Sequence, residues 1–117
     1  MRATEIFLPL PPSANKLWRY GQERVFKSPE YQSWLEEAGY KLNGQHPRPV
    51  PGPYKLTILA QRPPRRHRDL GNLEKALSDI LVRHKVVDDD AWCDAIFARW
   101  VTTGEGVALR IEPAGVE

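Results

Sequence analysis

The stretch RRHRDLGNLEKALSDIL, residues 65–81, decides most of what can be predicted for this chain. Its apolar residues recur at helical spacing and fall within roughly 100° of arc on a helical wheel. A face of this kind must be buried, so we predict an amphipathic helix from about Leu70 to Arg83. The residues of the buried face are Leu70, Leu73, Leu77, Ile80 and Leu81.

The polar side of this predicted helix combines three kinds of functional group. Asn72, Lys75 and Asp79 share a second stripe, and Asp69 stands at the N-terminal end. Each residue has an ordinary explanation, because Asp69 could cap the helix and Lys75 could pair weakly with Asp79. Together, however, they would place a carboxylate, an amide and an ammonium on the same open side of a rigid element.

Charge is distributed unevenly around the same helix, although the net charge of +2 decides little. Either charged segment could be a solvated loop, but their combination favours a polyanion approaching a site that holds a divalent cation. Mg²⁺ takes hard oxygen ligands, and a bound cation reverses the local sign that carboxylates impose on a phosphate backbone. Arginines then add attraction that does not depend on nucleotide sequence. The basic residues are Arg62, Arg65, Arg66, His67 and Arg68, and the acidic residues are Asp88, Asp89 and Asp90.

Length and composition predict one globular domain over residues 1–117, with 41% hydrophobic and 27% charged residues. The single cysteine, Cys93, excludes an internal disulfide framework and is expected to be a small buried hydrophobe. The apolar runs are too short for a membrane span, and the N-terminus lacks the pattern of a signal peptide. We therefore expect a cytoplasmic protein with no membrane partner.

The first half of the chain predicts a strand, a helix and a second strand. Residues 4–10 suit a short strand, and residues 11–27 are expected to form a loop. Ser28 is a good helix cap followed by proline, which predicts a helix to about Leu42 with Trp34 in the core. A loop over 43–53 and a strand over 54–61 follow.

The second half continues with the amphipathic helix, an acidic turn and two strands. Residues 94–102 and 106–113 alternate well enough to predict an antiparallel pair around TGEG, with Val107, Leu109 and Ile111 on one face. The order β-α-β-α-β-β predicts an α+β fold, in which helices pack mainly on one face of a mixed sheet.

These residues resemble RusA-type Holliday junction resolvases, small homodimeric endonucleases of bacteria and of phages or prophages. The likeness covers most of the chain, from LPLPPSANKLWR through DLGNLEKALSDIL to VDDDAWCD. Its most specific part is an Asp-x-x-Asn motif, followed by a lysine three residues later and then by an acidic turn. The resemblance implies a RusA-like fold.

The resemblance also implies an activity. The expected function is Mg²⁺-dependent cleavage of four-way DNA junctions, with Mn²⁺ as a possible substitute, during DNA recombination and repair. A homodimer would make paired symmetric nicks, and no small-molecule cofactor is expected. By the resemblance, Asp69, Lys75 and Asp90 are catalytic, and Asp69 and Asp90 bind the metal. Asp89 is expected as a further metal ligand. Asp79 fits the family pattern with a less defined, structural part.

DNA contacts are expected in the N-terminal loop and in the arginine-rich segment that leads into the predicted helix. The N-terminal loop combines phosphate-binding groups with the aromatic rings of Trp18 and Tyr20, as DNA-binding segments do. A surface loop with Trp18 packed inward explains the same residues equally well. The expected DNA-binding residues are Asn15, Lys16, Arg19, Arg65, Arg66, Arg68 and Asn72.

Gly71 departs from the best-known member of the family, which has a third metal-binding aspartate at this position. Some relatives could have glycine here naturally, with Asp88, Asp89 or a water completing the metal shell, or the metal could bind more weakly. Alternatively, the chain has lost cutting activity and kept only junction binding. A further hypothesis is that the arginine-rich segment docks on an acidic protein partner instead of DNA.

Overall fold

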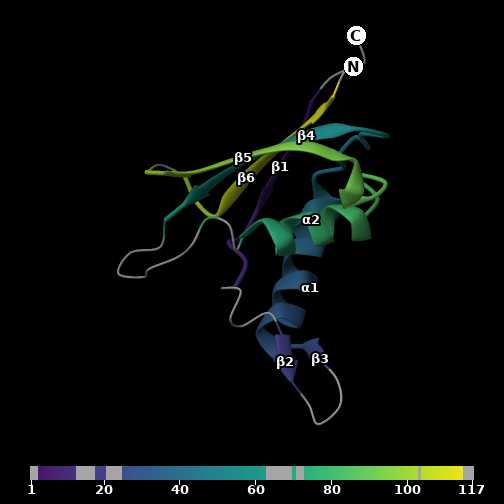
Figure 1. Cartoon of the computed structure of the whole chain (residues 1–117). Coiled ribbons are helices and arrows are strands. Elements are labelled where there is room, and N and C mark those ends of the chain that lie inside the picture. The colour runs from purple at the N-terminus through teal and green to yellow at the C-terminus, as the bar shows by residue number, and fades with distance from the viewer. Residues whose placement is uncertain are drawn as a thin grey trace.

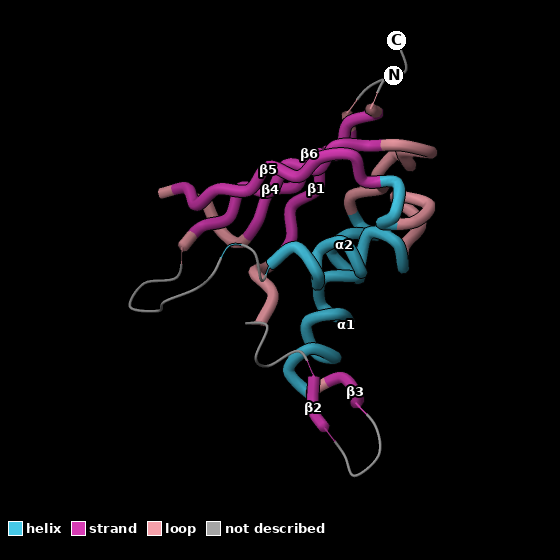
Figure 2. The backbone as a smooth tube through the Cα atoms, in the orientation of Figure 1, coloured by secondary structure: helices cyan, strands magenta, loops and turns pink. Residues whose placement is uncertain are grey.

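The computed structural model describes residues 3–12, 18–20, 25–62, 70, 73–102 and 104–114, with backbone alone for 18–20 and 25–27. A four-stranded sheet forms one layer and two helices form the other (Figure 1 and Figure 2). The elements are β1 (Thr4–Leu8), β2 (Trp18–Tyr20), β3 (Val25–Lys27), α1 (Pro29–Gly44), β4 (Tyr54–Gln61), α2 (Leu73–Arg83), the 3₁₀ turn η3 (Asp90–Trp92), β5 (Cys93–Val101) and β6 (Val107–Pro113).

The predicted α+β fold with helices on one face is confirmed. The sheet has the order β1-β6-β4-β5, in which β4 and β5 run parallel and the other neighbours run antiparallel. No helix in the described part of the chain is long and apolar enough to cross a membrane.

The core lies between the sheet and the two helices, as the alternation of apolar residues predicts. Val107, Leu109 and Ile111 of β6 are buried on one face, as expected from the sequence. The predicted stripe of α2 is also confirmed, because its four residues within the helix are fully buried and Leu70 packs partly against the core. Those four residues are Leu73, Leu77, Ile80 and Leu81.

Helix α1 begins as its sequence predicts. The Ser28 hydroxyl accepts a hydrogen bond from the Tyr31 backbone N–H at 3.1 Å, and Pro29 occupies the first helical position. Trp34 is 5% exposed, so its expected place in the core is confirmed. The helix continues to Gly44, two residues beyond the predicted end.

The predicted antiparallel pairing of the last two strands is wrong. β6 lies between β1 and β4, and β5 lies on the far side of β4 as an edge strand (Figure 1). Burial explains this order, because β6 contributes three buried apolar side chains whereas β5 is largely exposed. A central position removes more apolar surface from water than an edge position does, and the short connection did not determine the pairing.

The loop expected over residues 11–27 is also partly wrong. β2 and β3 pair antiparallel as a short hairpin, with Trp18 opposite Lys27 and Tyr20 opposite Val25, and Figure 1 shows it beside the start of α1. Aromatic and β-branched residues in both segments favour extended backbone. Strands of three residues are too short to produce a readable alternation, so the sequence pattern did not reveal them.

The turn that enters β6 requires a glycine at one position. Gly106 has φ +65°, and a Cβ there would overlap the backbone carbonyl oxygen of Leu8 at the end of β1. Its own carbonyl accepts a hydrogen bond from the Gln61 N–H at 2.9 Å. Strands β1, β4 and β6 therefore meet at a point where no side chain fits.

We predict that Gly106→Ala destabilises the fold far more than Gly104→Ala does. Both glycines have positive φ, so both variants incur backbone strain of about 1 kcal/mol or more. A Cβ at Gly104 would meet open space, whereas a Cβ at Gly106 would meet the Leu8 backbone. Urea denaturation of the two variants measures the difference, and equal losses would contradict the steric argument.

Candidate functional site

The three aspartates of the acidic turn occupy different environments. The Asp88 carboxylate accepts a hydrogen bond from the Gly52 N–H at 3.2 Å, and Asp89 caps η3 by accepting from the Ala91 N–H at 3.0 Å. Asp90 is the first residue of η3 and is exposed, and no backbone N–H of the described residues donates to its carboxylate. Asp88 and Asp89 therefore shape the turn, and Asp90 is left available for binding.

The turn is held in place by contacts with the preceding loop and with α2. Val50 forms a parallel bridge with Val87, and its N–H donates to the Val86 carbonyl at 2.7 Å. Both Val50 and Val87 are 1% exposed. Because η3 also packs against α2, the position of Asp90 is fixed relative to that helix.

A cluster of negative charge surrounds Asp90. The pKa of its carboxyl is raised, first by hydrogen bonding with Asp89, then by partial burial and by the charges of Asp89, Glu74 and Asp79. Glu74 lies in the first turn of α2 and is not among the site residues that the sequence pattern predicts. The sequence does contain an indication of its role, because Glu74 is an acid three residues after Gly71 and is therefore a possible replacement for the missing aspartate.

The hydroxyl of Tyr54, the first residue of β4, lies within reach of the charges of this cluster. Tyr54 is fully buried, and its hydroxyl forms no hydrogen bond of ordinary geometry with the described residues. Burial raises the pKa of Tyr54, and the neighbouring Cys93 thiol and the charges of Asp90 and Glu74 raise it further. Cys93 is partly buried and packs against the core, so the expected buried hydrophobe is confirmed in part. Burial raises the pKa of its thiol.

Two of the predicted polar residues of α2 differ in their exposure and contacts. Lys75 is exposed, as a residue that meets a phosphate must be. Asp79 is half-buried and accepts a hydrogen bond from the Tyr31 hydroxyl of α1 at 2.7 Å. The structural part expected for Asp79 is consistent with this contact, which ties the two helices together.

We predict that Tyr31→Phe lowers the free energy of unfolding by about 1–3 kcal/mol, because the Asp79 carboxylate loses a charge-assisted hydrogen bond. Tyr31 is 1% exposed and stacks near Trp34, and phenylalanine preserves that packing. Chemical denaturation measures the loss. Tyr40→Phe is the matched control, since Tyr40 is 84% exposed, and an equal effect of both variants would contradict the role assigned to the hydroxyl.

We predict that Asp90→Asn stabilises the metal-free protein at neutral pH. A raised pKa means that the folded chain binds the proton more tightly than the unfolded chain. Stability therefore rises as the pH falls through the folded pKa toward the ordinary aspartate value. The asparagine removes the repulsion at any pH. Thermal denaturation in a chelator measures the effect, with exposed Asp94→Asn as control, and a lower melting temperature for Asp90→Asn would contradict the prediction.

Several predicted site residues lie outside the described residues, namely Asn15, Lys16, Arg65, Arg66, Arg68, Asp69 and Asn72, together with Gly71. The backbone of Arg19 lies in β2. Of the basic cluster, Arg62 is described, and its guanidinium lies 5.0 Å from the centre of the Trp100 ring, a cation–π contact. The expected meeting of Asp69 and Asp90 therefore stays a prediction.

The carboxylates around Asp90 suit a hard divalent cation by donor type. Within the described ranges, no group of three or more histidine, cysteine, aspartate or glutamate side chains is arranged to hold a metal ion. An ion at Asp90 would therefore need a further ligand from outside these ranges, and Asp69 is the predicted one. The buried Tyr54 hydroxyl adds a polar group on the inner side of the cluster.

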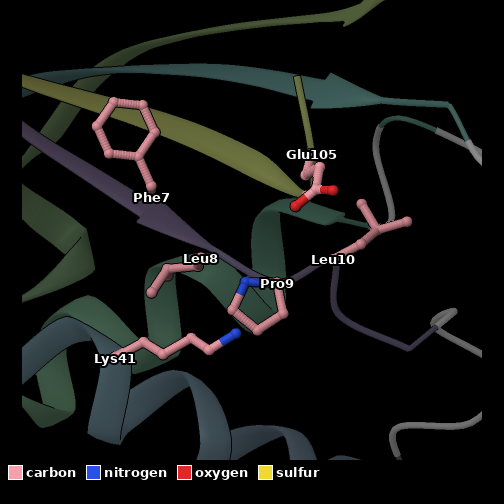
Figure 3. Close-up of a pocket in the computed structure, with 7 residues that line it drawn as sticks. Phe7, Leu8, Pro9, Leu10, Lys41 and Glu105 are labelled. Carbon is pink, nitrogen blue, oxygen red and sulfur yellow. The ribbon is translucent and has the colours of Figure 1, made fainter. Parts of the chain in front are cut away.

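A hollow of about 460 Å³ lies elsewhere, between the end of β1, α1 and the turn before β6 (Figure 3). Phe7, Leu8, Pro9 and Leu10 line it, and its charged groups are Lys41 and Glu105, which Figure 3 shows on different sides of it. It contains none of the predicted metal or catalytic residues. The hollow is therefore separate from the acidic cluster.

The mixed sheet, the acidic turn packed on α2 and the arginine-rich segment are features of a small nucleic-acid-processing α+β protein. Residues 9–112 match the family described as Endodeoxyribonuclease RusA. The chain belongs to this family, and the predicted resemblance is confirmed. Its members are nucleases, which hydrolyse phosphodiester bonds.

Relatives named crossover junction endodeoxyribonuclease RusA are similar along most of the chain. The proteins of Escherichia coli K12 and Enterobacteria phage 82 are each 35% identical over 92 residues, covering 78% of this chain and 77% of theirs. That of Escherichia coli O139:H28 is 32% identical over 120 residues and covers the whole of both chains.

Proposed function

We propose that this chain is a Mg²⁺-dependent, structure-selective endodeoxyribonuclease that resolves four-way DNA junctions by paired symmetric nicks. It would act as a homodimer in DNA recombination and repair, in the cytoplasm, with Mn²⁺ as a substitute ion. A phage or prophage origin agrees with the relative in phage 82. The observation that carries the proposal is the exposed Asp90 carboxylate, held by η3 against α2 within a cluster of acids.

The proposed chemistry assigns each residue a separate part. Asp69 and Asp90 would bind the ion, and Asp89 would support Asp90 through the cap that shapes η3. When bound, a divalent ion supplies charge neutralisation at the phosphate and acidifies a coordinated water. Lys75, exposed on α2, would stabilise negative charge that develops on the phosphate.

DNA binding would rest on sequence-independent contacts with the backbone. Three arginines shortly precede α2 in the sequence, namely Arg65, Arg66 and Arg68. They would bring phosphates toward Lys75 and Asp90. Asn72 and the N-terminal residues Asn15, Lys16 and Arg19 would add further contacts with the junction. The expected contribution of each arginine is similar across DNA sequences.

Dimerisation agrees with the face of the sheet that the helices leave uncovered. Phe7 is 60% exposed and Phe97 58% exposed. A mainly apolar hollow of about 260 Å³ lies along the sheet and is lined by Phe7, Leu59 and Ala108, with the Glu5–Arg110 ion pair beside it. A second copy covering this face would bury apolar surface, and a two-fold enzyme suits a two-fold junction.

A second function is a catalytically silent protein that binds junctions without cutting them. Gly71 favours it, because the family's metal-binding aspartate is missing there. The acidic cluster argues against it, since like charges held together destabilise a metal-free fold unless they serve a cation. We therefore keep the nuclease as the proposed function.

We predict that the protein nicks labelled four-way junctions symmetrically in Mg²⁺, and that chelator or Asp69→Asn abolishes the nicks. Loss of a metal ligand removes both charge neutralisation and water activation. Supporting residues of metal sites already change activity by about 10–100-fold, so we expect a fall in rate of at least about a hundredfold. Denaturing gels that resolve all four strands measure the position and symmetry of cleavage.

Glu36→Gln on α1 is a matched control that removes one exposed acid without touching the cluster. Junctions that are retarded in native gels yet stay uncut over a range of Mg²⁺ and Mn²⁺ would establish the silent binder. No retention of DNA even at low salt would overturn both functions and favour an acidic protein partner for the arginines.

A further inference from the structure

We propose that Glu74 supplies the metal-binding carboxylate that the family pattern places at position 71. The inference rests on the proposed function, because it concerns the ion that the nuclease would use. It goes beyond the family pattern by assigning the missing ligand to a residue on α2, where Glu74 comes three residues after Gly71 in sequence. Figure 1 shows α2 below the sheet, on the side where the chain turns into β5.

Glu74 is placed to share an ion with Asp90. It belongs to the first turn of α2, and η3 packs against this helix. Its charge is among those acting on the Asp90 carboxyl and on the Tyr54 hydroxyl, so all three groups lie within electrostatic reach of one another. A glutamate side chain is also long and flexible enough to move toward an ion that Asp90 binds.

The Glu74 carboxylate is oriented but not neutralised. The Ser78 hydroxyl, on a residue 2% exposed, donates a hydrogen bond to one of its oxygens, and none of the described residues donates to the other. Within the described part of the chain, no lysine, arginine or histidine forms an ion pair with it. A half-buried carboxylate facing another acid without a cation is the arrangement that a divalent ion relieves.

The Tyr54 hydroxyl supplies independent support for a ligand at this place. It is buried and forms no hydrogen bond of ordinary geometry with the described residues, with only the weakly bonding Cys93 thiol beside it, although a buried donor of this kind ordinarily has a good partner. The two carboxylates whose charge reaches it are Asp90 and Glu74. A phenol in this position can donate to a carboxylate that turns to bind an ion, or to a water in the ion's shell.

The other candidates for the missing ligand differ from Glu74 because each accepts a hydrogen bond from the backbone, whereas Glu74 accepts one from a side chain. Asp88 accepts a hydrogen bond from the Gly52 N–H, which fixes the loop before β4. Asp89 caps η3 through the Ala91 N–H, so recruiting it fully would open the turn that positions Asp90. Glu74 can rotate toward an ion without disturbing any backbone hydrogen bond of the acidic turn.

The test is Mn²⁺ binding to the full-length protein, measured by isothermal titration calorimetry and by the loss of the free Mn²⁺ signal in electron paramagnetic resonance. We expect Glu74→Gln to weaken binding by about tenfold or more, since even supporting residues of metal sites change affinity by about 10–100-fold. Glutamine keeps an oxygen that accepts from Ser78, so the local packing is preserved. Glu36→Gln is the charge-matched control and should bind as the parent does.

A rescue variant separates a ligand from a merely structural residue. Gly71→Asp combined with Glu74→Gln returns one carboxylate to the family position, and we expect it to recover most of the lost affinity. Weakened binding without recovery in the double variant would overturn the inference, as would unchanged binding in Glu74→Gln. Ser78→Ala is the second variant, and it should weaken binding by a smaller factor, because the carboxylate is less well oriented.

The parallel junction assay keeps this inference separate from the proposed function. If the parent protein cuts junctions while Glu74→Gln binds Mn²⁺ unchanged, the ligand assignment fails and the nuclease stands. If the parent protein neither cuts nor retains junctions, the proposed function fails whatever the metal titration shows.

Discussion

The parallel pairing of β4 and β5 is the constraint on which the site depends. Two parallel neighbours require the chain to cross the sheet between them, and α2 is the helix of that crossover. The crossover carries the arginine-rich segment at its start and the acidic turn at its end, so it brings together residues that β4, α2 and η3 contribute separately. The apolar face of α2 fixes the helix on the sheet, with Leu73, Leu77 and Ile80 fully buried. Its polar face is thereby directed to the same side as Asp90.

The acidic cluster illustrates a conflict between stability and function. Asp90 has its pKa raised by Asp89 and by the charges of Glu74 and Asp79, so ionising it costs more free energy in the folded chain than in the unfolded chain. The fold maintains this arrangement with contacts that have no chemical role of their own, including the Val50–Val87 bridge and the hydrogen bonds of Asp88 and Asp89. Strain of this kind is commonly retained where a bound group relieves it.

The sequence predicted the parts of the fold that depend on local pattern and burial. The Ser28 cap, the buried face of α2 and the alternation of Val107, Leu109 and Ile111 all follow from spacing alone. The neighbours of β5 and β6 could not be read in this way, because pairing depends on which strand gains more by burial in the centre of the sheet. For the site, Asp90 and Lys75 were found as exposed residues, whereas the separate tasks of Asp88 and Asp89 depend on backbone contacts that no spacing reveals.

Compared with a site that has an aspartate at position 71, the combination of Gly71 and Glu74 moves one negative charge three residues along the chain and leaves the total charge of the site the same. A carboxylate in the first turn of a helix interacts favourably with the helix dipole, by about 0.3–1 kcal/mol at exposed positions. Glu74 has this place in α2 and is further held by Ser78, so its charge is tolerated beside Asp90. An aspartate at 71 and a glutamate at 74 together would add one more negative charge to a cluster that already raises the pKa of Asp90. We therefore expect glycine at position 71 to accompany glutamate at position 74. A second acid would add repulsion at the site and contribute little to metal binding.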